Sequence, residues 1–245
     1  MALFPRDYAD LKGTLSSETA LKILGNANPG DLFEVEGFLP PEILKQLPNL
    51  PFEIGLFSPS RQDRPQWNNA AQICVVGEKT GVSFPAGVRY PEQVKHSHPA
   101  YFAVEGIGRI DASPSEGDLG ELLMRYPFCP REHVVAVDGA VEITADAKNQ
   151  RGYRFSLWAL GNLPGLVASG AKDPLSFGAY RTVLRPLMTD LASKGTPYLL
   201  ETNGFMSGGV RFRIGFCPWK DVNYREGRLS LPEVEIPVLE TIDCR

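Results

Sequence analysis

The sequence lacks the features that mark several specialised classes of protein. No apolar run approaches the roughly 18 residues that a membrane-spanning helix needs. Residues 1–7 show no basic segment followed by an apolar core, so we expect no secretory signal and a cytoplasmic protein. The formal net charge is −4, whereas a domain dedicated to nucleic acid usually carries a basic surplus. The composition therefore predicts a soluble globular protein that binds neither nucleic acid nor membrane, and it leaves the oligomeric state open.

Cysteine is scarce, with four residues in 245 and no C-x-x-C pair: Cys74, Cys129, Cys217 and Cys244. A zinc cage of cysteine thiolates needs closely spaced pairs, so such a cage has no support. Free cysteine is usually buried, and we expect at least three of the four to be buried, reduced thiols. Cys129 lies close to His133 in the chain, but no third polar partner accompanies them. A second metal site, or a nucleophile with its base, is therefore disfavoured there.

The densest group of potential metal ligands is the segment His96-Ser97-His98-Pro99. Side chains alternate between the two faces of an extended strand, so His96 and His98 fall on one side, about 7 Å apart along the backbone. They can converge on one cation. Zinc is the expected metal, because neutral imidazole binds it well and a catalytic zinc site combines three protein ligands with an open position for water.

A third ligand is available in the segment Pro114-Ser115-Glu116-Gly117-Asp118. Ser115 and Asp118 have the spacing of a helix capping box, and Leu119 and Leu122 begin an apolar helical face behind it. The structural and the metal-binding interpretation are compatible, because a capped helix start would hold Asp118 rigidly.

His-Ser-His-Pro followed by Pro-Ser-x-x-Asp resembles the motif of the JAMM family of zinc metalloproteases, also called MPN-plus or JAB. Many members remove ubiquitin or ubiquitin-like proteins. The resemblance implies an α/β fold of the α+β kind, with a mixed β-sheet flanked by helices and a cytidine-deaminase-like core. It covers residues 31–160, between an N-terminal leader at 1–30 and a C-terminal α/β extension at 161–245 that packs on the core. The spacer between Pro99 and Ser115 is longer than is usual in the family, and we expect residues 100–113 to form a flap beside the metal.

The resemblance also implies a catalytic glutamate on the strand that follows the first helix. The sequence predicts a helix at 42–47 and then a strand at 52–57, which places Glu53 at this position. Glu34 is the competitor, because it also resembles a family glutamate followed by Gly-x-Leu, although it precedes the helix. The implied roles are therefore zinc ligands for His96, His98 and Asp118, general base for Glu53, and hydrogen-bond donor to the oxyanion for Ser115.

The implied activity is zinc-dependent hydrolysis of a peptide or isopeptide bond after the C-terminal tail of a ubiquitin-like protein. Two alternatives stay open: a non-catalytic MPN-type scaffold in which the long spacer displaces Asp118, and a zinc amidohydrolase of small molecules. The presence of both histidines, the serine and the aspartate favours the enzyme, because a scaffold has no physical need for all of them.

Several elements are predicted without the resemblance. Asp138-Gly139 between two apolar runs indicates a β-hairpin. Apolar residues at 210–216 alternate with Arg211 and Arg213, which predicts a strand with exposed arginines. Helical spacing at 180–191 predicts a helix that Pro186 kinks or breaks.

Overall fold

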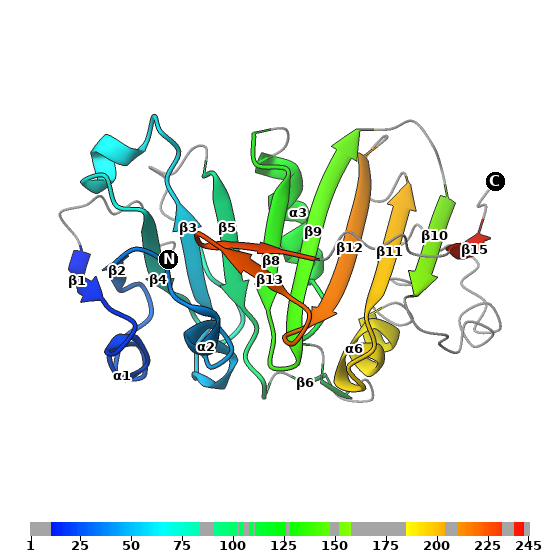
Figure 1. The fold of residues 1–245 in the computed structure, drawn as a ribbon, viewed down its shortest axis with the longest axis horizontal. Coiled ribbons are helices and arrows are strands. Elements are labelled where there is room, and N and C mark those ends of the chain that lie inside the picture. The colour runs from blue at the N-terminus through cyan, green and yellow to red at the C-terminus, as the bar shows by residue number, and fades with distance from the viewer. Residues whose placement is uncertain are drawn as a thin grey trace.

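The structure is a computed structural model that describes residues 11–83, 91–101, 103–104, 108–109, 111–125, 128–147, 152–157, 185–203, 210–231 and 238–242. These residues form a mixed α/β fold on one 11-stranded sheet, whose strands lie side by side in Figure 1. The strand order is β1-β2-β4-β3-β5-β8-β9-β12-β11-β10-β15. The predicted α/β class with a mixed sheet and flanking helices is therefore confirmed.

The first half of the sheet comes from the N-terminal part of the chain. Its strands are β1 (Leu11–Leu15), β2 (Leu32–Val35), β3 (Ile54–Ser58), β4 (Gln72–Val76) and β5 (Gln93–Ser97). β1 pairs in parallel with β2, whereas β2, β4, β3 and β5 pair antiparallel in that order. Every residue of β3 and β4 is buried, as expected for short apolar strands inside a sheet. The predicted leader thus supplies a strand to the sheet.

The second half of the sheet begins at the centre and runs to the other edge. Its strands are β8 (Arg131–Val135), β9 (Gly139–Ala147), β10 (Gly152–Leu157), β11 (Tyr198–Asn203), β12 (Val210–Pro218) and β15 (Val238–Ile242). β5 and β8 pair in parallel, and β8 and β9 form the hairpin predicted at Asp138-Gly139. β12 lies between β9 and β11, so strands of the C-terminal extension continue the same sheet.

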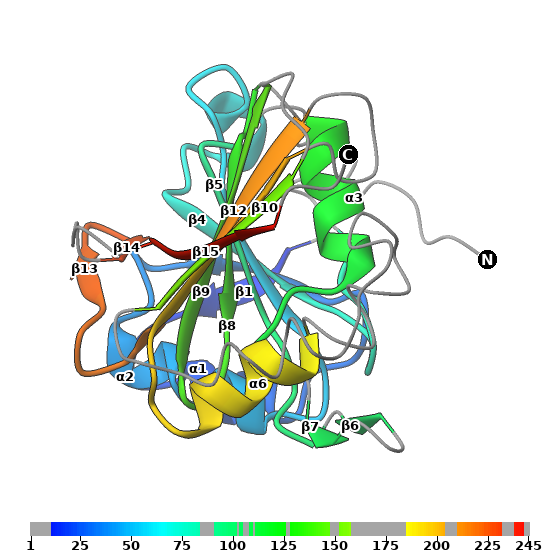
Figure 2. The ribbon, with the colours of Figure 1, turned by 90° about the vertical axis from the view of Figure 1, so that its right-hand side faces the viewer.

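Short helices and a hairpin cover the two faces of the sheet. α3 (Glu116–Arg125) and α6 (Arg185–Ser193) share an apolar cluster with β8, β9, β11 and β12. A second cluster joins α1 (Ala20–Leu24) and α2 (Pro41–Leu44) to β2, β3 and β4. Figure 2 shows α3 on one side of the sheet and the hairpin of β13 (Asn223–Arg225) and β14 (Arg228–Ser230) on the other. Two 3-10 turns, at Leu47–Asn49 and Arg64–Trp67, lie in loops.

Two predicted elements of the extension can be compared with the structure. Phe212, Ile214 and Phe216 are buried and alternate with exposed Arg213, so the strand at 210–216 is confirmed. The side chain of Arg211 lies outside the described residues, as does the start of the helix predicted at 180–191. The described part of this helix is α6 (Arg185–Ser193). The kink or break predicted at Pro186 stays a prediction, because the residues before Arg185 lie outside the described part of the chain.

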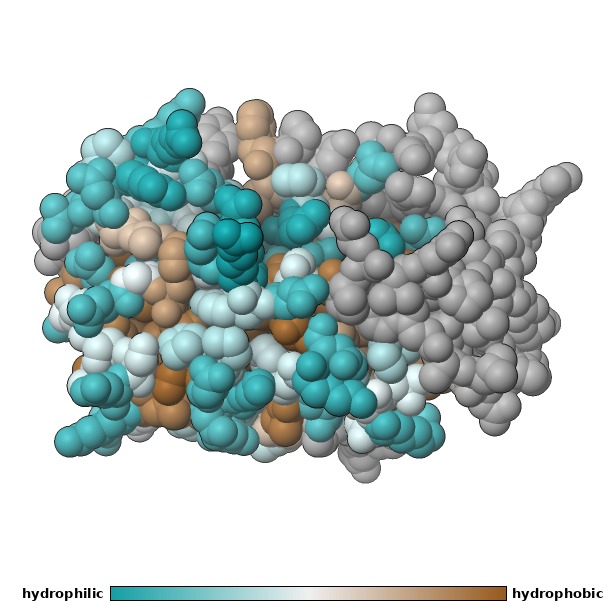
Figure 3. All heavy atoms as spheres, viewed as in Figure 1, coloured by the Kyte–Doolittle hydropathy of each residue, from teal (hydrophilic) through white to brown (hydrophobic). Residues whose placement is uncertain are grey.

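The surface over the β13–β14 side is mainly hydrophilic among the residues coloured in Figure 3, with smaller apolar areas between the polar side chains. Among the described residues, no helix combines the length and the apolar character that crossing a membrane requires. Three cysteines, Cys74, Cys129 and Cys217, are buried free thiols, as predicted, and Cys244 lies outside the described residues.

Candidate metal centre

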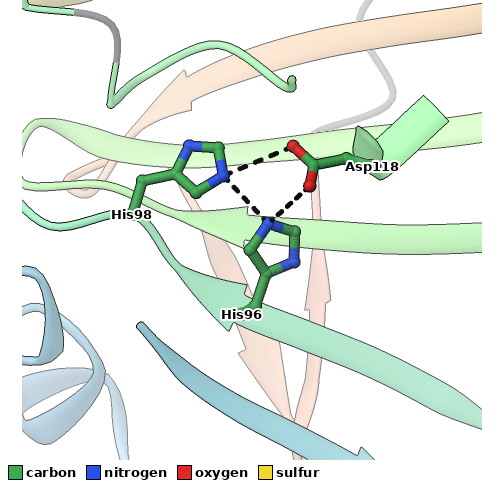
Figure 4. A group of neighbouring side chains, drawn as sticks. All are labelled: His96, His98 and Asp118. Atoms are coloured by element: carbon green, nitrogen blue, oxygen red, sulfur yellow. Dashed lines mark hydrogen bonds and ion pairs between the residues drawn. The ribbon is translucent and has the colours of Figure 1, made fainter. Parts of the chain in front are cut away.

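Two histidines converge at the end of β5. His96 belongs to the strand, and the backbone N–H of His98 donates to the Val135 carbonyl over 3.0 Å, so the pairing with β8 continues past the strand end. The Nε2 atoms of the two imidazoles lie 3.0 Å apart, and both side chains are buried. Figure 4 shows the two rings turned toward one another. The predicted convergence of these side chains is confirmed.

Asp118 reaches both histidines from the first turn of α3. Its Oδ1 lies 3.3 Å from Nε2 of His96 and its Oδ2 lies 3.3 Å from Nε2 of His98. One ligand atom from each of the three residues lies within 4.8 Å of the other two, and Figure 4 shows them pointing at a common space. Two imidazole nitrogens and one carboxylate oxygen suit a zinc ion with one open position. The structure therefore brings the three predicted ligands together, and their donor atoms fit the predicted metal.

The second nitrogen of each ring has its own partner. Nδ1 of His96 lies 2.9 Å from Oε1 of Glu132, and Nδ1 of His98 lies 3.0 Å from the carbonyl oxygen of Asp111. Both partners are acceptors, so each Nδ1 carries a proton and donates it. When the rings are neutral, each Nε2 therefore carries the lone pair and faces the shared space, as metal ligation requires. Sequence reasoning missed Glu132 and Asp111.

Neighbouring charges shift the pKa values of His96 and Asp118 in opposite directions. Burial lowers the pKa of His96, but the carboxylates of Asp118 and Glu132 outweigh it and hold this pKa well above its usual value. Burial raises the pKa of Asp118, but His96 and His98 outweigh it and hold this pKa well below its usual value. A cation at this point would displace a proton from the imidazole, because metal ligation needs neutral histidine.

Ser115 and Asp118 form the predicted capping box. The backbone N–H of Asp118 donates to Ser115 Oγ over 3.1 Å, and the backbone N–H of Ser115 donates to Oδ2 of Asp118. The box fixes the carboxylate of Asp118 at the helix start. Ser115 Oγ accepts in this pair and still has its own proton to donate. Ser115 thus lies next to Asp118, and its hydroxyl can donate a hydrogen bond.

Glu53 lies directly before β3 and close to the ligands. Burial raises its pKa, the charges of His98 and His96 lower it, and Asp118 raises it, so the carboxyl group is within electrostatic reach of all three. The strand begins at Ile54 and not at 52 as predicted, because the Ile54 N–H donates to Ser97 Oγ over 2.9 Å. This hydrogen bond to the serine of the HSHP segment holds the residue next to Glu53 against the histidine strand.

Glu34 lies on β2, and β4 and β3 separate that strand from β5. Of the two candidate general bases, Glu53 is therefore the one whose carboxyl group interacts with the histidines.

The backbone N–H of Gly77 donates to the Glu53 carbonyl over 2.8 Å, and a Cβ on this glycine would come within 2.9 Å of the same oxygen. The close approach of the two segments explains why this position is glycine.

No protein-family model, curated protein or solved structure matches the chain. The JAMM resemblance therefore depends on the two motifs and on the local geometry described above. That geometry suits hydrolysis, because it combines a metal-binding group with a carboxyl group of raised pKa and a hydroxyl donor.

Residues of the C-terminal extension hold the segment that leads into the site. Residues 111–113 end the long spacer, and the carbonyl of Asp111 fixes His98. The Tyr198 hydroxyl donates to the Ala112 carbonyl over 3.0 Å, and Nε of Arg185 donates to Ser113 Oγ over 3.2 Å. β11 and α6 thus hold the segment that leads into the capping box. Within the spacer, β6 (Ala103–Val104) and β7 (Gly108–Arg109) form a small antiparallel pair.

Cys129 and His133 do not contact each other. The Cys129 thiol donates to the Arg131 carbonyl over 3.4 Å, and burial raises its pKa. His133 instead pairs with Glu142, with 3.2 Å between Nε2 and Oε2. The thiol and the imidazole thus each have a different partner.

Proposed function

We propose that this chain is a JAMM-type zinc peptidase or isopeptidase that cleaves after the C-terminal tail of a ubiquitin-like protein, with residues 31–160 as the JAMM core. The observation that carries the proposal is the convergence of His96, His98 and Asp118, in which both imidazoles present Nε2 to one point. The mixed sheet with flanking helices agrees with a cytidine-deaminase-like core. The proposed setting is the cytoplasm.

Zinc held by these three side chains would lower the pKa of a bound water to about 7 and polarise the scissile carbonyl. The role proposed for Glu53 is to accept a proton from the attacking water and to give it to the leaving amine. Burial raises the pKa of Glu53, which makes its carboxylate a stronger base. Ser115 would donate its hydroxyl proton to the oxygen that becomes negatively charged.

The scaffold alternative required that the long spacer displace Asp118. Asp118 instead lies 3.3 Å from each histidine, and the spacer ends on residues that fix His98. These contacts favour the enzyme over the scaffold. The small-molecule amidohydrolase would use the same groups, so only the choice of substrate distinguishes it from a protease.

We expect the substrate tail to bind in extended form and to place a glycine next to the cut. β5 pairs on one side with β3 and on the other with β8, so the histidine strand itself has no open edge. The small β6–β7 pair in the spacer offers main-chain groups outside the large sheet. A tail that adds as a strand would therefore pair there, through main-chain hydrogen bonds.

The test is a substrate panel. Zinc-loaded protein is incubated with ubiquitin-like fusions and conjugates, with unrelated unfolded proteins and with small amides, and cleavage is followed by mass spectrometry. Selective cuts after a terminal glycine are expected. Indiscriminate cutting of unfolded chains would contradict the proposed substrate, and activity on small amides alone would assign the amidohydrolase function. Binding of ubiquitin-like proteins without any cleavage would assign the scaffold.

A further inference from the structure

We propose that Glu132 and Arg125 are positioning residues of the metal centre. Glu132 holds His96 in the tautomer that presents Nε2 to the metal, and Arg125 holds Glu132. We call these three residues the His96 group. The inference rests on the metal site of the proposed function, but it does not depend on which bond is cleaved.

The first contact in the His96 group joins β8 to β5. Oε1 of Glu132 lies 2.9 Å from Nδ1 of His96, and both side chains are only 2% exposed. The parallel register sets His96 beside Val134, so Glu132, two residues earlier, shares the face of the sheet that carries His96. A buried carboxylate at this distance accepts the Nδ1 proton firmly, because no water competes for either atom.

The second contact joins Glu132 to α3. Nη2 of Arg125 bonds Oε2 of Glu132, while Nη1 of the same arginine lies 3.0 Å from Oε2 of Glu121. Arg125 is the last described residue of α3, and Asp118 lies in the first turn of the same helix. Both ends of α3 therefore reach His96, the first through Asp118 directly and the last through Glu132.

Both oxygens of the buried Glu132 carboxylate have a partner. A carboxylate as buried as Glu132 is stable only when it is paired and hydrogen-bonded, and it has a partner on each oxygen. The proton on Nδ1 cannot move to Nε2 without breaking the contact with Glu132. A carboxylate behind a histidine ligand also makes the imidazole a stronger base, and loss of such a partner typically weakens metal binding about 10- to 100-fold.

The opposite face of the sheet contains a matched control. We call it the His133 group: His133, Glu142 and Arg131. Glu142 Oε2 lies 3.2 Å from Nε2 of His133 and 3.5 Å from Nη1 of Arg131, so a glutamate again pairs with a histidine and an arginine, here through the other imidazole nitrogen. His133 and Lys95 are register partners that alternate with Val134 and His96, which directs them away from the three ligands.

The experiment compares zinc affinity in wild type, Glu132→Gln, Arg125→Gln and Glu142→Gln, by competition with a chromophoric chelator. Glutamine keeps the shape of Glu132 and removes its charge. We expect about 10- to 100-fold weaker zinc binding for Glu132→Gln, a smaller loss in the same direction for Arg125→Gln, and no change for Glu142→Gln. Circular dichroism of each zinc-free variant checks that it is folded.

A second readout separates positioning from general stability. In the zinc-loaded protein, ¹H–¹⁵N spectra of the histidine rings report which nitrogen carries the proton. We expect the Nδ1–H signal of His96 to be sharp and strongly downfield in wild type and in Glu142→Gln, and to move or broaden in Glu132→Gln. Arg125→Gln leaves the carboxylate in place and provides a second path to the same result if Glu132→Gln folds poorly.

The outcomes of the two proposals are distinguishable. Equal zinc affinity and an unchanged His96 signal in Glu132→Gln would overturn this inference and leave the proposed function standing. Weakened zinc binding in Glu132→Gln, together with a wild type that cleaves nothing, would support this inference while the proposed hydrolysis fails. A wild type that binds no zinc would overturn both.

Discussion

The His96 group and the His133 group contain the same three residue types on opposite faces of one sheet, yet their electrostatics differ. His96 faces two carboxylates, Asp118 and Glu132, and its pKa is raised. Burial lowers the pKa of His133, and although Glu142 acts against this, Lys95 and Arg131 add to it. A histidine paired with a glutamate is therefore not a metal centre by itself.

The difference between the two groups lies in what the surrounding chain brings to the pair. On one face, His98 directly follows β5 and Asp118 lies at the capped start of α3, and both join His96. On the other, Glu142 is joined by two basic side chains, Lys95 and Arg131, which disfavour a further positive charge. Convergence of three donors from two separate segments distinguishes a site that can hold a metal from a structural ion pair.

Removal of both histidine ligands should have the largest effect. We expect purified wild type to contain near-stoichiometric zinc and the double variant His96→Ala, His98→Ala to contain none, because one carboxylate is left to hold the ion. His133→Ala, the control from the opposite face, should keep its zinc. Metal analysis by mass spectrometry measures all three proteins, and zinc in the double variant would show that the metal is held elsewhere.

The next largest effect concerns the general base. Glu53→Gln should bind zinc with normal affinity and lose about 100- to 10,000-fold in the rate of cleavage, because it removes a proton acceptor and leaves the ligands intact. Glu34→Gln, two strands farther from the histidines, should keep both zinc and activity. Rates on the best substrate of the panel check this prediction, and the reverse pattern would assign the role to Glu34.

Replacement of Lys95 tests the face that carries the His133 group. This lysine is 1% exposed, its amine donates to the Gln93 amide over 3.0 Å, and burial lowers its pKa to about 7. Between about 7 and the usual 10.5 the unfolded chain binds more protons at this residue, so wild-type stability should rise with pH across this window. Lys95→Met removes the buried amine and should stabilise the fold by about 1–4 kcal/mol at pH 7.

The gain from Lys95→Met should shrink as the pH rises toward 10.5, because the lysine then loses its proton in the unfolded chain as well. Urea denaturation at several pH values measures it, and zinc affinity serves as the control. A variant that is less stable than wild type at pH 7, or that binds zinc more weakly, would show that the amine supports the metal face of the sheet.

The smallest predicted effect is how the contribution of each histidine to the stability of the zinc-free protein changes with pH. The raised pKa of His96 stabilises the fold fully below its usual value of 6.5, and this contribution is lost as the pH rises through the folded-state value. The lowered pKa of His133 acts oppositely, because its cost is absent above 6.5 and appears as the pH falls through its folded-state value. Between pH 5 and 8, His96→Gln and His133→Gln should therefore change the slope of stability against pH in opposite directions.

Urea denaturation in the presence of a chelator measures these slopes, and slopes of the same sign would contradict the assignment. Added zinc should abolish the His96 contribution and make stability rise with pH, because the ion competes with the proton for the same imidazole.

Local patterns in the sequence predicted much of the fold and the inner part of the site. The β8–β9 hairpin and the capping box each depend on residues close together in the chain, and the convergence of His96 and His98 depends on strand alternation alone. These features could be predicted because each has its own short-range physical signal.

The outer parts of the site could not be predicted in the same way. Glu132 reaches His96 only through the parallel register of β5 and β8, and Asp111 reaches His98 only because Tyr198 and Arg185 hold its neighbours. Register between distant strands leaves no local mark in a single sequence. An acidic residue that shares a strand face with a core residue, as Glu132 does with Val134 two positions later, is the signal that could have identified it.

The crossover from β5 through α3 to β8 has a further consequence for the unfolding of this domain. The candidate metal ligands lie at the end of β5 and on α3. A bound ion would therefore cross-link the chain across a loop of about 20 residues and reduce the conformational freedom of the unfolded state. Opening of α3 would then require release of the ion as well as loss of packing. Backbone amides in this crossover should therefore exchange with solvent together, as one cooperative unit whose lifetime the metal sets.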